Sequence, residues 1–133
     1  MGPLMAPYPL ILIADDYLDS RDGYAKFLKF NGLRVILAAD GERALTLAAD
    51  EKPDVVVVDL GLPRIDGWEV LRRLKTDPWT KGIRVIVLTG HASRESHERA
   101  QRAGCDLFLT KPCLPDELLA AIRTLLPDDA LRL

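Results

Sequence analysis

The chain has 133 residues, of which 48% are hydrophobic and 29% charged, and its formal net charge at pH 7 is −2. This length suits a single hydrophobic core, and the composition is that of a folded soluble domain, not of a disordered chain. Lys and Arg do not cluster, which argues against direct nucleic-acid binding through a broad basic face, and no apolar run approaches the ~18 residues that span a membrane.

Residues 1–8 lack the basic start and long apolar stretch of a secretory signal. They are expected to form a short loose leader. Cys105 and Cys113 have no zinc-like spacing, so we expect free thiols in a reducing compartment. Together these features predict a cytoplasmic protein with no membrane partner.

Five short apolar runs predict strands. Most are continuous and rich in β-branched residues, which is typical of strands covered on both faces of a sheet. They lie at residues 10–14, 35–38, 55–58, 85–88 and 107–109.

Five amphipathic segments alternate with the strands and predict helices. In the first, Tyr24, Phe27, Leu28 and Leu18 share a face, and Asn31-Gly32 provides a stop. The fourth has an apolar face made only of alanines, so we expect it to be weakly anchored. In chain order, the second to fifth helices begin near residues 40, 66, 93 and 115.

Strands that alternate with helices through short connections predict right-handed crossover units around a parallel sheet. One α/β domain over residues 9–127 is expected, followed by a short tail at 128–133.

Polar residues follow four of the predicted strands: Asp15-Asp16, Asp59, Thr89-Gly90 and Lys111-Pro112. Ligands of open α/β sheets bind at the carboxyl ends of the strands, so these groups should converge. Clustered carboxylates need a cation, and oxygen ligands together with a phosphate suit Mg²⁺. A carboxylate can attack phosphorus, and the lysine ammonium can bind phosphate oxygens.

Each of these residues has an ordinary explanation when it is taken singly. A strand-terminal Asp or Thr commonly caps a helix or forms a turn, and a lone lysine is usually solvated. Their joint placement on one edge of the sheet favours a phosphoryl site.

These motifs resemble the receiver domain of bacterial response regulators over about residues 10–126. The segment Asp59-Leu60-Gly61-Leu62-Pro63-Arg64-Ile65-Asp66-Gly67 looks like the family's phosphoacceptor loop throughout. The resemblance implies a flavodoxin-like fold, a doubly wound five-stranded parallel sheet of order 2-1-3-4-5 with five helices.

The resemblance also implies the roles of the acidic residues. Asp59 would be the phosphoacceptor and, with Asp16, a direct ligand of Mg²⁺. Asp15 would bind the metal directly or through water, and the backbone carbonyl of Gly61 would complete the protein ligands.

A switch is implied by the same resemblance. Thr89, Gly90 and Lys111 would contact the phosphoryl group, and the bond before Pro112 is expected to be cis. Phe108 occupies the switch-aromatic position, and its ring is expected to rotate inward when Thr89 moves; the alternative is a static core ring.

Three positions depart from the commonest pattern. Gly61 offers no side chain to the site, and His91 lies two residues after Thr89; in the family these positions tune the lifetime of the acyl phosphate. Cys113 replaces a frequent aromatic residue. His97, on the polar fourth helix, is expected simply to be exposed.

The function implied is that of a phosphorelay switch, not of a conventional enzyme, with intrinsic self-phosphorylation and autodephosphorylation. The donor would be a phosphohistidine of a sensor histidine kinase or phosphotransfer protein. The output would be a protein partner or a self-dimer, bound through the fourth helix, fifth strand and fifth helix.

Three alternatives remain. A haloacid-dehalogenase-type phosphohydrolase needs a second Asp two residues after the nucleophile, where Gly61 stands. A flavin or dinucleotide carrier needs a phosphate-cradling loop, which is absent after the first strand. The third alternative is a receiver-like interaction module that has the same fold but acts without phosphorylation.

Overall fold

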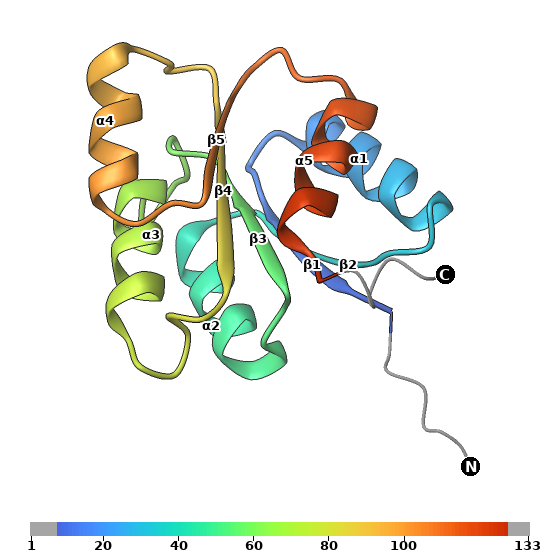
Figure 1. The fold of residues 1–133 in the computed structure, drawn as a ribbon, viewed down its shortest axis with the longest axis horizontal. Coiled ribbons are helices and arrows are strands. Elements are labelled where there is room, and N and C mark those ends of the chain that lie inside the picture. Colours follow the sequence, from blue (N-terminus) through green and yellow to red (C-terminus); the bar gives the residue numbers. More distant parts are fainter. Residues whose placement is uncertain (1–7, 128–133) are drawn as a thin grey trace.

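The computed structural model describes residues 8–127 (Figure 1). The expected tail at 128–133 lies outside the described residues, and so does the expected leader apart from Tyr8. Among the described residues, no helix is both long and apolar enough to cross a membrane.

Five parallel strands form one sheet in the order β2-β1-β3-β4-β5, which confirms the predicted topology. All five predicted runs become strands, and three of them extend by one residue at one or both ends. The strands are β1 (Leu10–Ala14), β2 (Arg34–Ala38), β3 (Val55–Val58), β4 (Arg84–Thr89) and β5 (Leu107–Thr110).

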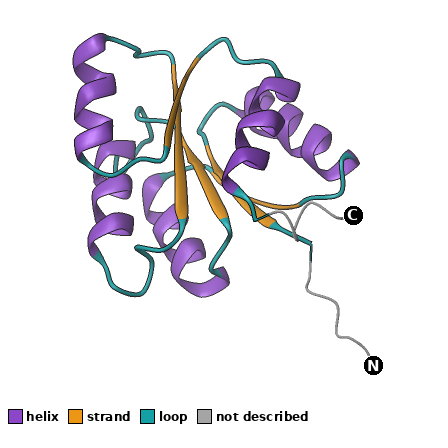
Figure 2. Ribbon diagram, viewed as in Figure 1, coloured by secondary structure: helices purple, strands orange, loops and turns teal. Residues whose placement is uncertain are grey.

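Helices cover both faces of the sheet, with α1 and α5 on one side and α2, α3 and α4 on the other (Figures 1 and 2). Their bounds are α1 (Leu18–Phe30), α2 (Gly41–Glu51), α3 (Gly67–Thr76), α4 (Arg94–Arg102) and α5 (Pro115–Leu125). The alternating order of strands and helices therefore gives three layers.

Two apolar cores lie on the two faces of the sheet. In β1, Ile11 and Ile13 pack toward α1 and α5, whereas Leu12 and Ala14 pack toward the other helices. This alternation explains why the strand is apolar without interruption, since both sets of side chains are removed from water. The edge strands β2 and β5 are only half-buried, because each has a neighbour on one side only.

Local polar residues fix where three helices begin. Asp40, Asp66 and Ser93 each accept a hydrogen bond from the backbone N–H three residues ahead, which satisfies a free donor of the first turn. At the end of α1, Gly32 adopts a φ of 87°, as the predicted stop requires.

The expected apolar face of α1 is partly wrong. Leu18 is 56% exposed, whereas Tyr24, Ala25 and Leu28 are buried. Leu18 is the first residue of the helix and precedes the buried positions, which begin at Tyr24. The expectation that α4 is weakly anchored agrees with the structure, because Ala100 is the only buried residue of that helix.

Candidate functional site

The carboxyl ends of the strands bring three carboxylates together. Ala14 pairs with Val58 in the sheet, so Asp15 and Asp59 leave neighbouring strands side by side. One carboxylate oxygen from each of Asp15, Asp16 and Asp59 lies within 4.8 Å of the others. Asp15 is buried, Asp59 is half-buried and Asp16 is exposed. The site is therefore a rim of negative charge that opens to solvent at Asp16.

Lys111 bridges two of these carboxylates. Its Nζ lies 2.9 Å from Oδ2 of Asp15 and 2.9 Å from Oδ2 of Asp59. Partial burial disfavours the ammonium form, but the two hydrogen-bonded carboxylates outweigh it and raise the pKa of Lys111 above its usual value. The backbone N–H of Lys111 donates to the carbonyl of Thr89, and the bond to Pro112 is cis.

Asp15 is held in place by hydrogen bonds to its side chain and to its backbone. Its Oδ1 accepts from the backbone N–H of Tyr17 at 2.9 Å, and its backbone carbonyl accepts from Nη1 of Arg21 at 3.0 Å. Tyr24 of α1 donates through its hydroxyl to the carbonyl of Cys113, two residues beyond Lys111. Sequence reasoning missed Arg21 and placed Tyr24 only on the apolar face of the first helix, because neither residue belongs to a recognisable functional motif.

The loop from Asp59 to Gly67 is tightly fitted. Oδ1 of Asp59 accepts from the backbone N–H of Gly61 at 3.0 Å, which fixes the carboxylate relative to its own loop. A Cβ atom on Gly67 would lie 2.2 Å from the carbonyl oxygen of Asp59, and one on Gly41 would lie 1.7 Å from that of Ile65. Two glycines therefore allow the loop to pack against itself and against α2.

Arg64 ties the outer side of this loop to α2. It adopts a φ of 69°, and its guanidinium lies 3.8 Å from Asp40 and 3.7 Å from Glu42. Arg64 and Glu42 are exposed and Asp40 is half-buried, and at these long distances each ion pair contributes little to stability. Arg64 thus places its guanidinium beside α2 from a left-handed backbone conformation that few non-glycine residues adopt.

Thr89 ends β4 and is fully buried. Its Oγ1 accepts a hydrogen bond from the backbone N–H of His91 at 3.1 Å, while Gly90 and the His91 side chain are exposed. The hydroxyl therefore lies at the edge that carries the carboxylates, bound to its own loop.

Phe108 is half-buried in β5 and packs on the core beneath α4. The prediction for His97 of α4 is incomplete: the residue is exposed, as expected, but its ring stacks on Phe108 with centroids 4.8 Å apart and an interplanar angle of 21°. No sequence pattern indicates this contact, because it depends on how α4 lies across β5.

The geometry agrees with comparisons to known proteins. A family model described as the response regulator receiver domain matches residues 11–123. The chain belongs to that family. It is a receiver domain of two-component systems, a family of phosphoacceptor signalling switches that bind Mg²⁺ at an acidic pocket.

Among curated relatives, the receiver domain is 42% identical over 123 residues to the response regulator MprA of Mycolicibacterium vanbaalenii, covering 90% of this chain and 52% of the relative. It is 41% identical over 124 residues to MprA of Mycobacterium leprae, covering 90% and 54%. The chain thus spans about half the length of the curated relatives it matches.

Solved structures resemble the receiver domain over nearly its whole length. Chemotaxis protein CheY4 of Vibrio cholerae has a TM-score of 0.84 at 28% identity, covering 90% of this chain and 99% of that one. A CheY-like receiver domain from Methanospirillum hungatei has a TM-score of 0.81 at 32% identity, covering 88% and 92%. The BeF₃-activated DrrB receiver domain has a TM-score of 0.78 at 32% identity, covering 89% and 97%.

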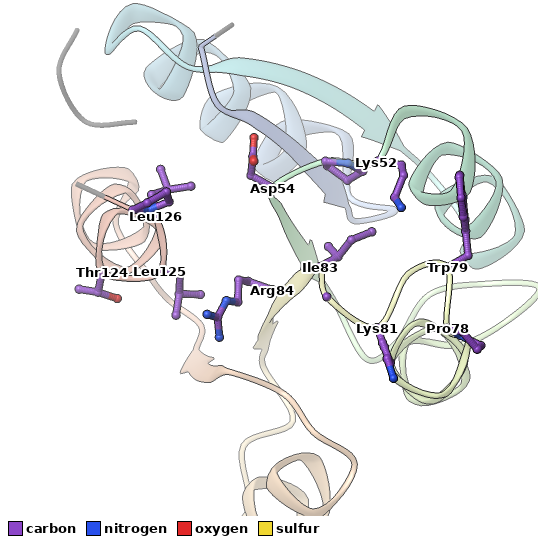
Figure 3. Close-up of a pocket in the computed structure, with 13 residues that line it drawn as sticks. Lys52, Asp54, Pro78, Trp79, Lys81, Ile83, Arg84, Thr124, Leu125 and Leu126 are labelled. Carbon is purple, nitrogen blue, oxygen red and sulfur yellow. The ribbon is translucent and has the colours of Figure 1, made fainter. Parts of the chain in front are cut away.

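A large cavity of the receiver domain lies away from the carboxylates (Figure 3). It has a volume of about 840 Å³ and is lined by residues that include Lys52, Trp79 and Arg84. Arg84 begins β4, so this cavity lies at the amino ends of the strands, opposite Asp59. Its position excludes it from the phosphoacceptor chemistry.

Proposed function

We propose that this receiver domain accepts a phosphoryl group on Asp59 from a phosphohistidine of a sensor histidine kinase or phosphotransfer protein. The observation that carries the proposal is the contact of Lys111 with both Asp15 and Asp59 beside a third carboxylate. An ammonium in this place is already positioned to bind oxygens of a phosphoryl group attached to its neighbour.

The transfer would be a direct displacement at phosphorus. A carboxylate oxygen of Asp59 forms the new O–P bond while the N–P bond of the phosphohistidine breaks, and the electron pair of that bond returns to the imidazole nitrogen. Lys111 would exchange its contact with Asp59 for one with a phosphoryl oxygen and offset the charge that develops there. The same geometry would accept the phosphoryl group of acetyl phosphate, with acetate as the leaving group.

The acidic residues fit Mg²⁺. The three carboxylate oxygens lie within 4.8 Å of one another, and opposite ligands of an octahedral ion at about 2.1 Å are about 4.2 Å apart, so small movements of the side chains would bring all three onto one ion. Asp15, Asp16 and Asp59 would hold the ion, with the backbone carbonyl of Gly61 as a further ligand. When bound, Mg²⁺ neutralises charge on the carboxylates and on the transferred phosphoryl oxygens.

Thr89 would respond to phosphorylation of Asp59. Its hydroxyl, together with the N–H groups near Gly90, would turn toward the phosphoryl group and give up the hydrogen bond from His91. Phe108 would then rotate inward and reshape the surface of α4, β5 and α5. The shallow anchoring of α4 supports this motion, since few buried side chains resist it.

The remodelled surface would bind a downstream protein or a second copy of the chain, without direct contact to nucleic acid or membrane. We place this exchange in the cytoplasm, where a sensor kinase presents its phosphohistidine.

Intact-protein mass after incubation with acetyl phosphate tests the proposal. Wild type should gain one phosphoryl group in Mg²⁺ and none with a chelator, and Asp59→Asn should gain none in either condition. A folded wild-type protein that gains no mass would contradict the proposal and favour a receiver-like module that acts without phosphorylation.

His91 is proposed to tune the lifetime of the acyl phosphate, because its exposed side chain follows the buried Thr89 by two residues. His91→Ala should change the rate at which the adduct decays after the donor is removed. The decay is followed by intact mass, with wild type and Asp50→Ala as references. Equal decay of all three proteins would remove His91 from the mechanism.

A further inference from the structure

The His97–Phe108 stack is a contact that the phosphoryl chemistry does not itself require. Its rings are 4.8 Å apart between centroids and nearly parallel at 21°, so the imidazole covers one face of the phenyl ring. His97 lies near the middle of α4, and Phe108 lies in β5. The pair therefore joins the edge strand to the helix that covers it.

Little else holds α4 against the sheet. Ala100 is the only residue of the helix that is buried, and the basic Arg94, Arg99 and Arg102 are all exposed. Arg99 reaches instead over the Trp68 ring of α3, at 4.0 Å from its centroid. The His97–Phe108 stack thus adds an aromatic contact between α4 and β5 to the burial of Ala100.

Phe108 shares a sheet face with Thr89. It pairs with Val87 of β4 and packs on the same core as that residue. Side chains two residues apart on a strand point to the same face, so Thr89 lies on that face as well, diagonally across from Phe108. A shift of the Thr89 side chain toward Asp59 would change the space available to the Phe108 ring.

We propose that His97 is a positioning residue of the switch: by stacking on Phe108 it holds the ring on the α4 side and slows phosphorylation of Asp59. The proposal rests on the proposed function, since it concerns how readily that site is modified. A contact present in only one of two states favours that state by the free energy of the contact. An aromatic pair of this kind shifts such an equilibrium by roughly twofold to tenfold.

The test compares initial rates of adduct formation with acetyl phosphate and Mg²⁺, measured by intact-protein mass. His97→Ala removes the stacked ring and should be phosphorylated roughly twofold to tenfold faster than wild type. His97→Phe keeps an aromatic ring at the position and should return the rate to that of wild type. Glu98→Ala alters the next exposed residue of α4 and should leave the rate unchanged.

A second readout does not depend on phosphorylation. In the unphosphorylated His97→Ala variant, backbone hydrogen exchange should be faster than in wild type in α4 and β5, and unchanged in α1. Because His97 is exposed, its replacement should leave global unfolding nearly unaffected, and a urea titration checks this.

The outcomes separate the two proposals. A wild type that forms no adduct overturns the proposed function and, with it, the role of His97. If wild type is phosphorylated but His97→Ala reacts at the same rate or more slowly, or if His97→Phe behaves like His97→Ala, the positioning role is overturned while the proposed function stands.

Discussion

Asp106 shows how a single carboxylate organises the sheet away from the phosphoacceptor site. Its Oδ2 accepts from the backbone N–H of Val85 at 2.7 Å and lies 3.0 Å from Nζ of Lys75, and its Oδ1 lies 3.4 Å from the guanidinium of Arg84. One side chain in the turn before β5 thus joins α3, β4 and β5. Burial opposes its charge, but the hydrogen bonds from Val85 and Lys75 prevail and lower the pKa of Asp106 below its ordinary value of 3.8.

Asp106→Ala should therefore lower the free energy of unfolding by about 1–3 kcal/mol near neutral pH, because it leaves the Val85 N–H without its acceptor and removes the ion pair of Lys75, whose ammonium keeps its hydrogen bond to the Ile83 carbonyl. Since the pKa is lowered in the folded state, the contribution is fully present above the ordinary carboxyl pKa. It is lost as the pH falls through the lower folded-state pKa.

Urea denaturation at several pH values measures this difference. Asp50→Ala, an exposed change on α2, serves as the control and should stay within about 0.5 kcal/mol of wild type. A wild-type advantage that grows as the solution is acidified would contradict the argument.

At the scale of elements, two glycines that each lie between an aspartate and an aromatic residue differ in the space around them. Gly67 begins α3, and a Cβ there would lie 2.2 Å from the Asp59 carbonyl oxygen. Gly23 lies within α1, and a Cβ there would meet nothing within 4 Å. Of these two glycines, only Gly67 is needed for close packing.

Gly67→Ala should lower the free energy of unfolding by about 2–3 kcal/mol, because the Asp59 backbone has to move. Gly23→Ala should raise it by about 0.5–1 kcal/mol, since alanine favours the helix and fits without contact. Urea titrations of both variants and of wild type measure the two changes. Equal destabilisation by both substitutions would show that the loop does not impose the close approach.

The same elements show what a sequence can predict. Continuous apolar runs located all five strands, and Asp40, Asp66 and Ser93 marked helix starts that the structure places within one residue. The exposure of Leu18 and the stack of His97 on Phe108 were not predictable in this way. Both depend on where one element ends against another, which the local pattern does not encode.

At the scale of the whole molecule, the candidate site combines residues that are far apart in the chain. Asp15 and Lys111 are separated by 96 positions yet form a hydrogen bond of 2.9 Å. Parallel strands with common carboxyl ends make this convergence predictable, because every strand delivers its last residue to one edge. The supporting contacts from Arg21 and Tyr24 were not predictable, since they arise from the packing of α1 beside the site.

Convergence of three carboxylates also couples the site to global stability. Their mutual repulsion is offset in part by Lys111, whose ammonium reaches Asp15 and Asp59 but has no hydrogen bond to Asp16. A cation that binds only the folded chain stabilises it by mass action, and at ten times its Kd the gain is about 1.4 kcal/mol. For a domain of this size, that gain corresponds to a rise in Tm of about 3–6 °C.

Mg²⁺ should therefore raise the Tm of wild type in a saturable way, as measured by thermal unfolding followed by circular dichroism. Asp16→Asn should abolish most of this rise, because it removes an exposed ligand without breaking a hydrogen bond of the fold, whereas Asp50→Asn should retain it. In the absence of Mg²⁺, Asp16→Asn should be at least as stable as wild type, since one repelling charge is gone. An equal rise in all three proteins would mean that the ion acts through general screening and not at the acidic site.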